Sequence, residues 1–268
     1  MFAIISDIHG NLEALQAVLA DIDERGLKEI VCLGDVIGYG PNPRECLDLV
    51  LERCRLCMMG NHDHAVLYEP ANFNTAAERA AYWTRLTLEA ETDRAARNRR
   101  WAFLGKLPVR LREGQILYVH ASPRRPINEY IFPEDVFTNP QKVLSNFERL
   151  DAQLCFVGHT HQPGVFLDDP YFDPPHELPD SPYWEVDDER AIINVGSVGQ
   201  PRDKDPRASY VVVHTYATNG SGESNPLTRE VEQIEFVRVE YDIDKTVKKI
   251  LAEPMLDDML GHRLYEGR

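Results

Sequence analysis

Short apolar runs recur along the chain, and each is followed by a glycine or a polar residue. They cover residues 2–6, 30–33, 56–59, 116–119, 154–157 and 192–195. Continuous apolar runs of this kind are typical of strands buried on both faces, as in sheets that are covered by helices. The pattern therefore predicts a layered α/β architecture with polar side chains gathered at the carboxyl ends of its strands.

Segments with helical spacing lie between these runs. From residue 11 to residue 25 the apolar residues recur every three or four positions, and Gly26 follows as a stop signal. Further short helices are predicted at 43–52 and 243–251, and further strands at 210–214 and 235–241. We expect one domain over residues 1–268 because a chain of this length can bury one sizeable core.

A helical insertion is predicted at about 65–112. Residues 74–101 are rich in Ala, Arg and Glu, and we expect two helices that break near 91–93, with Thr92 or Asp93 as the cap of the second. Two interpretations of this insertion stay open, a partial lid over a site and a subdomain that only packs.

A proline-rich, acidic excursion follows at about 168–190. Five prolines in this stretch predict an irregular surface loop, with a strand-like run only at 183–186. We interpret His176, which lies within it, as a solvated loop residue.

Charge limits the classes of partner. The chain has 29 Lys and Arg against 44 Asp and Glu, a net charge of −15. Such a field repels polyanions, so we expect no binding of long DNA or RNA. No apolar stretch approaches the roughly 18 residues of a membrane span, and the N-terminus runs directly into a polar motif without a signal peptide. These features predict a cytoplasmic protein without a membrane partner.

Five cysteines in such a chain indicate reduced thiols rather than a disulfide framework. Cys54 and Cys57 form a C-x-x-C, for which a redox pair or half of a zinc site is the alternative. We interpret Cys32 and Cys155, which lie inside apolar runs, as small buried hydrophobic residues.

Candidate metal ligands occur in five blocks, most of them at the ends of the predicted strands. In chain order the blocks are Asp7-Ile8-His9, Gly34-Asp35, Gly60-Asn61-His62-Asp63, His120 and Gly158-His159-Thr160-His161. Oxygen donors and imidazoles without a thiolate suit two borderline divalent metals rather than a cysteine-rich structural zinc. This combination predicts hydrolysis of a phosphate ester.

The order of these blocks resembles the pattern of the calcineurin-like metallophosphoesterases, D-x-H, G-D, G-N-H-D/E, H and G-H-x-H. The segments 6–11 and 194–202 resemble the small bacterial and archaeal phosphodiesterase branch of that superfamily. The resemblance implies a four-layer α/β/β/α sandwich. It further implies cleavage of phosphodiesters or small phosphomonoesters by attack of a metal-bridging hydroxide.

Carried over residue by residue, the family pattern implies two metal sites that share one carboxylate. The first site would use Asp7, His9, Asp35 and His161, and the second would use Asn61, His120, His159 and again Asp35. We expect the two oxygens of Asp35 to reach the two ions separately. Manganese is our choice of metal, with iron, zinc, nickel or cobalt permitted by the mixed ligands.

His62 and Asp63 are the implied catalytic residues. In the family pattern His62 is not a ligand but donates a proton or a hydrogen bond to the leaving oxygen, and we expect Asp63 to favour its charged form. The alternative for His62 is a residue that only packs the loop. For His64 we expect a place on the surface or behind the ligands.

Substrate-binding residues are less well defined by the sequence. Branches of the family that act on phosphoproteins or dinucleoside tetraphosphates carry Asp-Arg soon after the G-D block, and this chain does not. Arg202, Arg124 and Arg125 are our candidates for a replacement phosphate clamp, with solvated surface charges as the alternative.

Three functions therefore remain from the sequence. The first is a phosphodiesterase or small-molecule phosphatase. The others are a dinucleoside polyphosphate hydrolase or protein phosphatase, which the missing Asp-Arg disfavours, and a non-catalytic scaffold, which the complete ligand set disfavours. The oligomeric state has no signature in the sequence.

Overall fold

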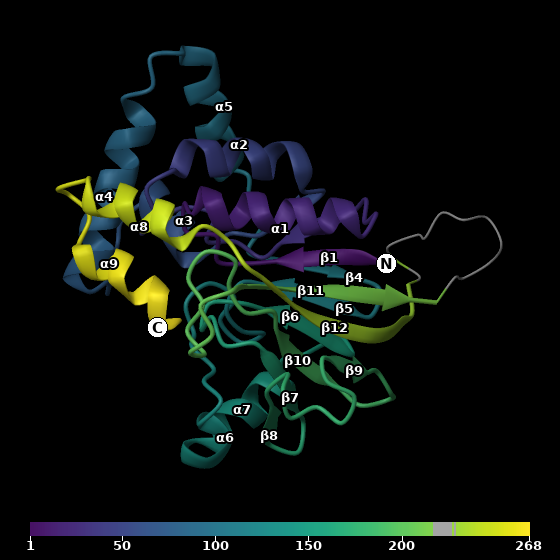
Figure 1. Ribbon diagram of the computed structural model, residues 1–268. Helices are drawn as coiled ribbons and strands as arrows, with labels where there is room; N and C mark the ends of the chain where they lie inside the picture. The colour runs from purple at the N-terminus through teal and green to yellow at the C-terminus, as the bar shows by residue number, and fades with distance from the viewer. Residues whose placement is uncertain (217–226, 228) are drawn as a thin grey trace.

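Two six-stranded sheets lie face to face with helices on both outer sides (Figure 1). The computed structural model describes residues 1–216, 227 and 229–268. The first sheet has the strand order β3-β2-β1-β11-β12-β9, and the second has the order β4-β5-β6-β10-β7-β8. The predicted four-layer α/β/β/α sandwich is confirmed.

The first sheet begins with a parallel half. Its strands are β1 (Phe2–Ile5), β2 (Ile30–Cys32), β3 (Leu56–Cys57), β9 (Tyr183–Glu185), β11 (Ala208–Thr215) and β12 (Val231–Val239). β1, β2 and β3 run parallel, whereas β11, β12 and β9 are added in antiparallel fashion. The carboxyl ends of β1, β2 and β3 therefore meet at one edge of this sheet.

The second sheet has its parallel strands in the centre. Its strands are β4 (Arg110–Glu113), β5 (Ile116–Val119), β6 (Leu154–Val157), β7 (Gly164–Leu167), β8 (Tyr171–Asp173) and β10 (Ala191–Asn194). β5, β6 and β10 are parallel, and β4, β7 and β8 are antiparallel to their neighbours. The loops that follow β5, β6 and β10 therefore lie at one edge of the second sheet.

Both faces of the central strands are covered, which explains why their sequences are apolar throughout. In β1, Phe2 and Ile4 pack between the two sheets, while Ala3 and Ile5 pack in the outer core with the helices. A strand of this kind has no solvent-facing side, because successive side chains point to opposite faces and both faces are covered.

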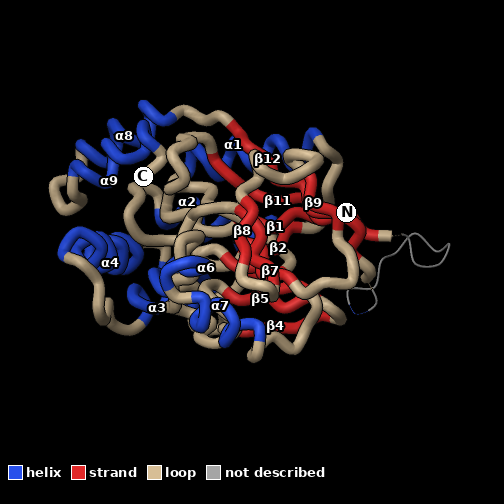
Figure 2. The backbone as a smooth tube through the Cα atoms, turned by 90° about the horizontal axis from the view of Figure 1, so that it is seen from below, coloured by secondary structure: helices blue, strands red, loops and turns tan. Residues whose placement is uncertain are grey.

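The helices form two outer layers. Covering the first sheet or its edge are α1 (Leu12–Glu24), α2 (Pro43–Arg53), α3 (Asn61–Leu67), α4 (Thr75–Glu89), α5 (Arg94–Leu104), α8 (Ile243–Leu251), α9 (Asp258–His262) and the 3₁₀ turn η2 (Arg263–Glu266). The other side carries α6 (Asp135–Thr138) and α7 (Pro140–Phe147). Figure 2 shows α4, α8 and α9 gathered at one end of the molecule. Among the described residues no helix combines the length and apolar composition needed to cross a bilayer.

The two helices of the insertion are confirmed, and they pack against the rest of the helical layer. α4 ends before the predicted break, and α5 is capped by Asp93, whose carboxylate accepts hydrogen bonds from Ala95 and Ala96. Leu88 and Leu104 are buried in the outer core that α1 and α2 share. The helices themselves therefore have a packing role.

The proline-rich excursion is more ordered than the irregular loop that we predicted. β8 pairs with β7, and β9 pairs with β12, so the excursion adds an edge strand to each sheet. Leu178 is buried between the sheets, which anchors the segment. His176 is solvated as predicted, with 79% of its side chain exposed.

All five cysteines are free thiols. Cys57 is buried and its Sγ lies 3.5 Å from the carbonyl oxygen of Met58. Within the described part of the chain, no group of side chains suited to a metal includes a cysteine. The structure thus favours the packing interpretation of the C-x-x-C over half of a zinc site.

Candidate metal centre

The five polar blocks converge where the parallel strands of both sheets end. The candidate ligands come from the loop after β1 (Asp7 and His9), the loop after β2 (Asp35), the first turn of α3 (Asn61), the end of β5 (His120) and the loop after β6 (His159 and His161). Except for the partly exposed Asn61, all of these side chains are buried. The structure thus brings the seven predicted ligands to one place.

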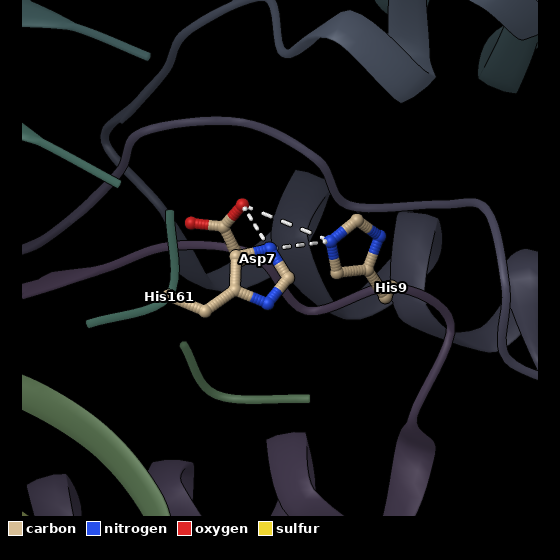
Figure 3. A group of neighbouring side chains, drawn as sticks. All are labelled: Asp7, His9 and His161. Atoms are coloured by element: carbon tan, nitrogen blue, oxygen red, sulfur yellow. Dashed lines mark hydrogen bonds and ion pairs between the residues drawn. The ribbon is translucent and has the colours of Figure 1, made fainter. Parts of the chain in front are cut away.

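Asp7, His9 and His161 form one cluster, and their side chains point toward one another (Figure 3). Asp7 Oδ1 lies 3.1 Å from His161 Nε2 and 3.7 Å from His9 Nε2. The two Nε2 atoms are 3.1 Å apart. We call these three residues the first triad.

Asn61, His120 and His159 form a second cluster, the second triad. His120 Nε2 lies 3.1 Å from Asn61 Oδ1 and 3.2 Å from His159 Nδ1. An amide oxygen and two imidazole nitrogens therefore face one point, a donor set that suits a borderline divalent metal.

Asp35 lies between the two triads. Its Oδ2 is 3.7 Å from His9 Nε2 and 3.4 Å from His120 Nε2. Its Oδ1 instead accepts a hydrogen bond of 2.7 Å from the backbone N–H of His62. We predicted that each oxygen would serve one ion, whereas the structure turns a single oxygen, Oδ2, toward both triads.

Hydrogen bonds behind the ligands fix which imidazole nitrogen faces the cluster. His120 Nδ1 lies 3.1 Å from the carbonyl oxygen of Leu33, and His161 Nδ1 lies 2.6 Å from that of Gln200. A carbonyl oxygen only accepts, so each Nδ1 must carry the proton. In the neutral form of either ring, the Nε2 lone pair is then directed into the centre.

The donor atoms lack the partners that buried polar atoms normally have. Asp7 Oδ1 is buried without a hydrogen bond, and two Nε2 atoms face each other across the first triad. Burial alone would lower the pKa of His120, but Asp35 raises it to about 9, so the position beside Asp35 favours positive charge. The residues therefore fit divalent cations at this centre.

The backbone of the ligand loops is unusual. Asp7, His9, Asp35, His159 and His161 all have φ between 50° and 65°, the left-handed region that residues other than glycine rarely adopt. Such conformations cost free energy and persist where the surrounding structure enforces them, most often at functional sites.

Two glycines allow the carboxylates to reach their positions. A Cβ at Gly60 would lie 2.0 Å from Asp35 Oδ1, and one at Gly158 would lie 2.2 Å from Asp7 Oδ2. Asp7 Oδ2 also accepts the N–H of His159 at 2.9 Å. The glycines of the G-N-H-D and G-H-T-H blocks are thus needed for close approach rather than for a turn.

The segment 194–202 braces these loops from the second sheet. Asn194 donates hydrogen bonds to the carbonyl oxygen of Gly158 and to Thr160. Ser197 Oγ donates to the carbonyl oxygen of Asp7 at 2.8 Å. This segment therefore connects the loop after β1 with the loop after β6, as required if both contribute to one centre.

His62 lies beside the first triad in an aromatic environment. Its ring centroid is 4.8 Å from that of His9, 4.3 Å from Tyr39 and 4.6 Å from Phe73. Burial lowers its pKa to about 4, although Asp35 acts in the opposite direction. Burial of the ring thus disfavours the charged form of His62 that we predicted. His62 also lies close enough to His9 and Asp35 to share a metal.

We expected Asp63 to favour the charged form of His62, but its carboxylate is bound to backbone groups. Its Oδ1 accepts backbone N–H groups of Val36 and Ile37, and its Oδ2 accepts that of Gly60. Burial and the negative charge of Asp35 raise the pKa of Asp63 to about 7. The geometry thus gives Asp63 a role in holding the loop after β2 against the start of α3.

The three predicted arginines have different environments. Arg124 is bound to Glu129 and donates to Ser145, so its guanidinium is already occupied. Arg125 is exposed and lines a cavity of about 570 Å³ next to Asn61 and His159. Arg202 lies beside the first triad, where its backbone N–H donates to the carbonyl oxygen of His161 at 3.2 Å.

Sequence reasoning missed several aromatic neighbours of the centre. Tyr130 stacks on the ring of His159 with centroids 3.8 Å apart, and Phe73 lies at the end of the loop before α4. Both line the same 570 Å³ cavity, which His64 also borders. Gly38 and Gly40, on either side of Tyr39, could have indicated that Tyr39 lies near the centre. No sequence motif surrounds Tyr130 or Phe73.

The chain is similar to several known proteins. The chain is 38% identical over 278 residues to an uncharacterised protein of Methanocaldococcus jannaschii, covering all of this chain and 98% of that protein. It is 37% identical to a metallophosphoesterase from Sphaerobacter thermophilus, whose crystal structure aligns with a TM-score of 0.77 over 100% of this chain and 98% of that one. A hypothetical protein from Pyrococcus horikoshii shares the fold, with a TM-score of 0.70 at 18% identity over 100% and 98% of the two chains.

The family match covers the residues that build the centre. The calcineurin-like phosphoesterase superfamily domain is matched by residues 1–218, a range that includes both triads, Asp35 and the bracing segment 194–202. By this match, the chain belongs to the calcineurin-like phosphoesterase superfamily.

Proposed function

We propose that the protein is a dinuclear, metal-dependent phosphohydrolase that cleaves phosphodiesters or small phosphomonoesters. The observation that supports it most is the position of Asp35 Oδ2, which lies within 3.7 Å of His9 Nε2 and 3.4 Å of His120 Nε2. One carboxylate oxygen shared by two nitrogen- and oxygen-rich triads is the arrangement that two adjacent cations require.

The residues have separable tasks in this proposal. The first triad with Asp35 would hold one cation and the second triad with Asp35 would hold the other, and manganese remains our choice. When bound, the two cations supply Lewis acidity and lower the pKa of coordinated water towards about 7. The hydrogen bonds that His120 and His161 donate to the carbonyl oxygens of Leu33 and Gln200 keep the Nε2 lone pairs directed inward.

His62 acts as a hydrogen-bond donor in this proposal. Its ring lies 4.8 Å from that of His9, and its Nδ1 has no hydrogen-bond partner. A neutral imidazole carries one N–H, which can be donated to the leaving oxygen as negative charge develops there. Gly38 makes room for the ring, because a Cβ there would lie 2.5 Å from His62 Nδ1.

The cavity beside the second triad suggests a small substrate. Its volume of about 570 Å³ is in the range of small-molecule sites. Arg125 is the exposed cation on its wall, and we propose that it contacts the part of the substrate that leaves the centre. The net charge of −15 argues against long nucleic acids as substrates. The five free thiols fit a cytoplasmic location.

The proposal is tested with purified protein whose metals have been removed by chelation and then restored one at a time. Each form is assayed on a generic monoester, a generic diester and diadenosine tetraphosphate, and its metal content is measured. We expect hydrolysis only after a divalent metal is restored. The diester or the monoester should be preferred, and hydrolysis of the tetraphosphate alone would favour the dinucleoside polyphosphate alternative.

The variant Asp35→Asn tests whether Asp35 is a ligand that both metal sites share. The amide oxygen can still accept the His62 N–H, but an NH₂ group then faces both triads and cannot ligate. We expect metal content and kcat/KM to fall together, the latter by at least about 100-fold. Asp23→Asn, a change at an exposed carboxylate of α1, is the matched control. A metal-replete, fully active Asp35→Asn variant would refute the shared-ligand arrangement.

A further inference from the structure

The ring of Tyr130 lies on a candidate ligand of the second triad. Its centroid is 3.8 Å from that of His159, and the two rings are inclined by only 23°. The two residues come from different loops, Tyr130 from the segment after β5 and His159 from the segment after β6. Because rings at this separation are in contact, the imidazole cannot turn toward Tyr130 without a clash. Tyr130 therefore limits the rotation of His159 about its Cβ–Cγ bond.

His159 is held differently from the other imidazoles of the centre. His120 and His161 each donate Nδ1–H to a backbone carbonyl oxygen and direct Nε2 into the centre. His159 is turned the other way: its Nδ1 lies 3.2 Å from His120 Nε2, and its Nε2 is buried without a hydrogen-bond partner. A ligand imidazole normally donates its second N–H to a group that fixes its orientation. Within the described part of the chain His159 has no such acceptor, so its orientation depends on packing.

The backbone at Tyr130 is anchored by the residues before and after it. The carboxylate of Glu129 is buried and accepts hydrogen bonds from Arg124 and Asn146. Ile131 is buried in the apolar cluster that β5, β6 and α7 form. A residue between two anchors of this kind has little freedom to move, so the position of the Tyr130 ring over the imidazole is fixed by the fold.

Phe132 restrains the ring of Tyr130 itself. The two ring centroids are 5.3 Å apart, and the ring planes differ by 3°. Phe132 is held in turn at the start of α6, where its backbone N–H donates to Asp135 Oδ2 at 2.7 Å. Tyr130 nevertheless remains 40% exposed. Its ring is therefore placed against a metal ligand without being a large part of a core, and its loss should cost little stability.

We propose that Tyr130 is a positioning residue of the second metal site. Its stacked ring holds the imidazole of His159 with Nδ1 directed at the cation, in place of the hydrogen bond that orients His120 and His161. The inference deepens the proposed phosphohydrolase function and rests on its metal centre. Tyr130 acts through His159, so it should affect the affinity for one of the two cations more than the affinity for the other.

The test titrates metal-free protein with Mn²⁺ by calorimetry, which measures the Kd of each cation without any turnover. In Tyr130→Leu the ring is absent, and we expect the Kd of one cation to rise at least about tenfold, as for loss of a group that orients a ligand. Tyr130→Phe keeps the stacked ring and should leave both Kd values within twofold of wild type. Tyr171→Leu is the matched control, because Tyr171 is an exposed tyrosine of β8, and it should change neither Kd.

The melting temperature of each metal-free variant shows whether it is folded. If Tyr130→Leu does not fold, Tyr130→Met is used with the same expectation. Kd values of both cations within twofold of wild type overturn the proposal. Equal losses in Tyr130→Leu and Tyr130→Phe also overturn it, because the hydroxyl rather than the ring would then be responsible. A wild-type protein that binds both cations but hydrolyses no ester would refute the phosphohydrolase function, while the Tyr130 variants would still decide this inference.

Discussion

At the scale of single residues, backbone conformation and backbone hydrogen bonds hold the candidate ligands in place. Five candidate ligands lie in the left-handed region, and each such conformation costs roughly 1–2 kcal/mol for a residue with a Cβ. Backbone hydrogen bonds enforce them, as between Asp7 N–H and Gly34 and between His9 N–H and Asp35. The loops are thus held by one another, which keeps reorganisation on metal binding small.

His62→Ala tests the role of the residue next to the first triad. Alkyl esters need a donor at the departing oxygen, whereas nitrophenolate leaves without one. We expect kcat/KM to fall by about 10²-fold or more on an alkyl phosphoester and by much less on the corresponding nitrophenyl ester. Steady-state kinetics on the matched pair of substrates measures the difference.

His176→Ala is the control for that prediction, because His176 is solvated in the proline-rich excursion. It should leave both rates unchanged. Equal losses on both substrates in His62→Ala, together with reduced metal content, would instead indicate that His62 is a ligand, as its distances to His9 and Asp35 permit.

A site residue could be predicted from the sequence only where neighbouring residues in the chain form a recognisable motif with it. The seven ligands were predictable because each lies in a short motif whose residues are adjacent in the chain. The orientation of Asp63 was not, because its backbone partners at Val36 and Ile37 belong to another loop. The place of Leu264 in one cluster with Tyr39 had no local signal, since only tertiary packing of η2 brings the two together.

At the scale of elements, a buried carboxylate connects α8 with α1. Glu13 Oε1 lies 2.7 Å from Lys249 Nζ, and its Oε2 accepts the hydroxyl of Thr246 at 3.1 Å. Only 3% of the Glu13 side chain is exposed. Because α8 leads through α9 into η2, this contact also supports the C-terminal turn.

Glu13→Gln should destabilise the protein in a pH-dependent manner. Burial alone would raise the pKa of Glu13, but its hydrogen bonds with Lys249 and Lys245 hold it below its usual value of 4.5. The stabilisation is therefore complete above pH 4.5 and is lost as the pH falls through the lower folded-state pKa. We expect a difference in unfolding free energy of about 1–2 kcal/mol at pH 7, measured by urea denaturation, that narrows below pH 4.5.

Glu24→Gln, a change at an exposed position on the same helix, is the control for this pH series. It should have little effect at any pH. A Glu13→Gln deficit that stays constant down to pH 3.5 would show that packing rather than charge accounts for the loss.

The elements themselves were largely predictable, and the exceptions have a physical reason. Strands such as β1 and β6 have continuous apolar runs because helices and the other sheet cover both faces. β8 was missed because an edge strand needs no such run: Tyr171 is exposed, and three residues pair with β7. Pairing partners, which decide edge strands, are not encoded locally.

At the scale of the whole molecule, a local positive site lies within an acidic surface. The net charge is −15, while the Arg202 guanidinium, which donates to Gln200 Oε1, belongs to a residue whose backbone contacts His161 of the first triad. Local charges act on a single phosphoryl group at short range, whereas the global field acts on the whole ligand. The molecule should therefore select small anions over long ones.

If charge selects the substrate, kcat/KM should fall as the substrate becomes longer, and added salt should weaken this dependence. At an ionic strength of about 0.01 M, where the Debye length is about 30 Å, we expect kcat/KM for a long single-stranded oligonucleotide to be at least about tenfold below that of a dinucleotide with the same scissile bond. Raising the ionic strength to about 0.15 M shortens the Debye length to about 8 Å and should narrow the gap, because the added phosphates no longer experience the −15 field. A bis-nitrophenyl phosphodiester, with one charge, is the control, and its kcat/KM should change little with salt.

Protein–nucleic acid binding driven by counterion release shows the opposite trend, because its affinity falls as salt is added. A gap that salt does not change would assign the selection to the shape of the cavity, and equal rates at low salt would contradict selection by charge.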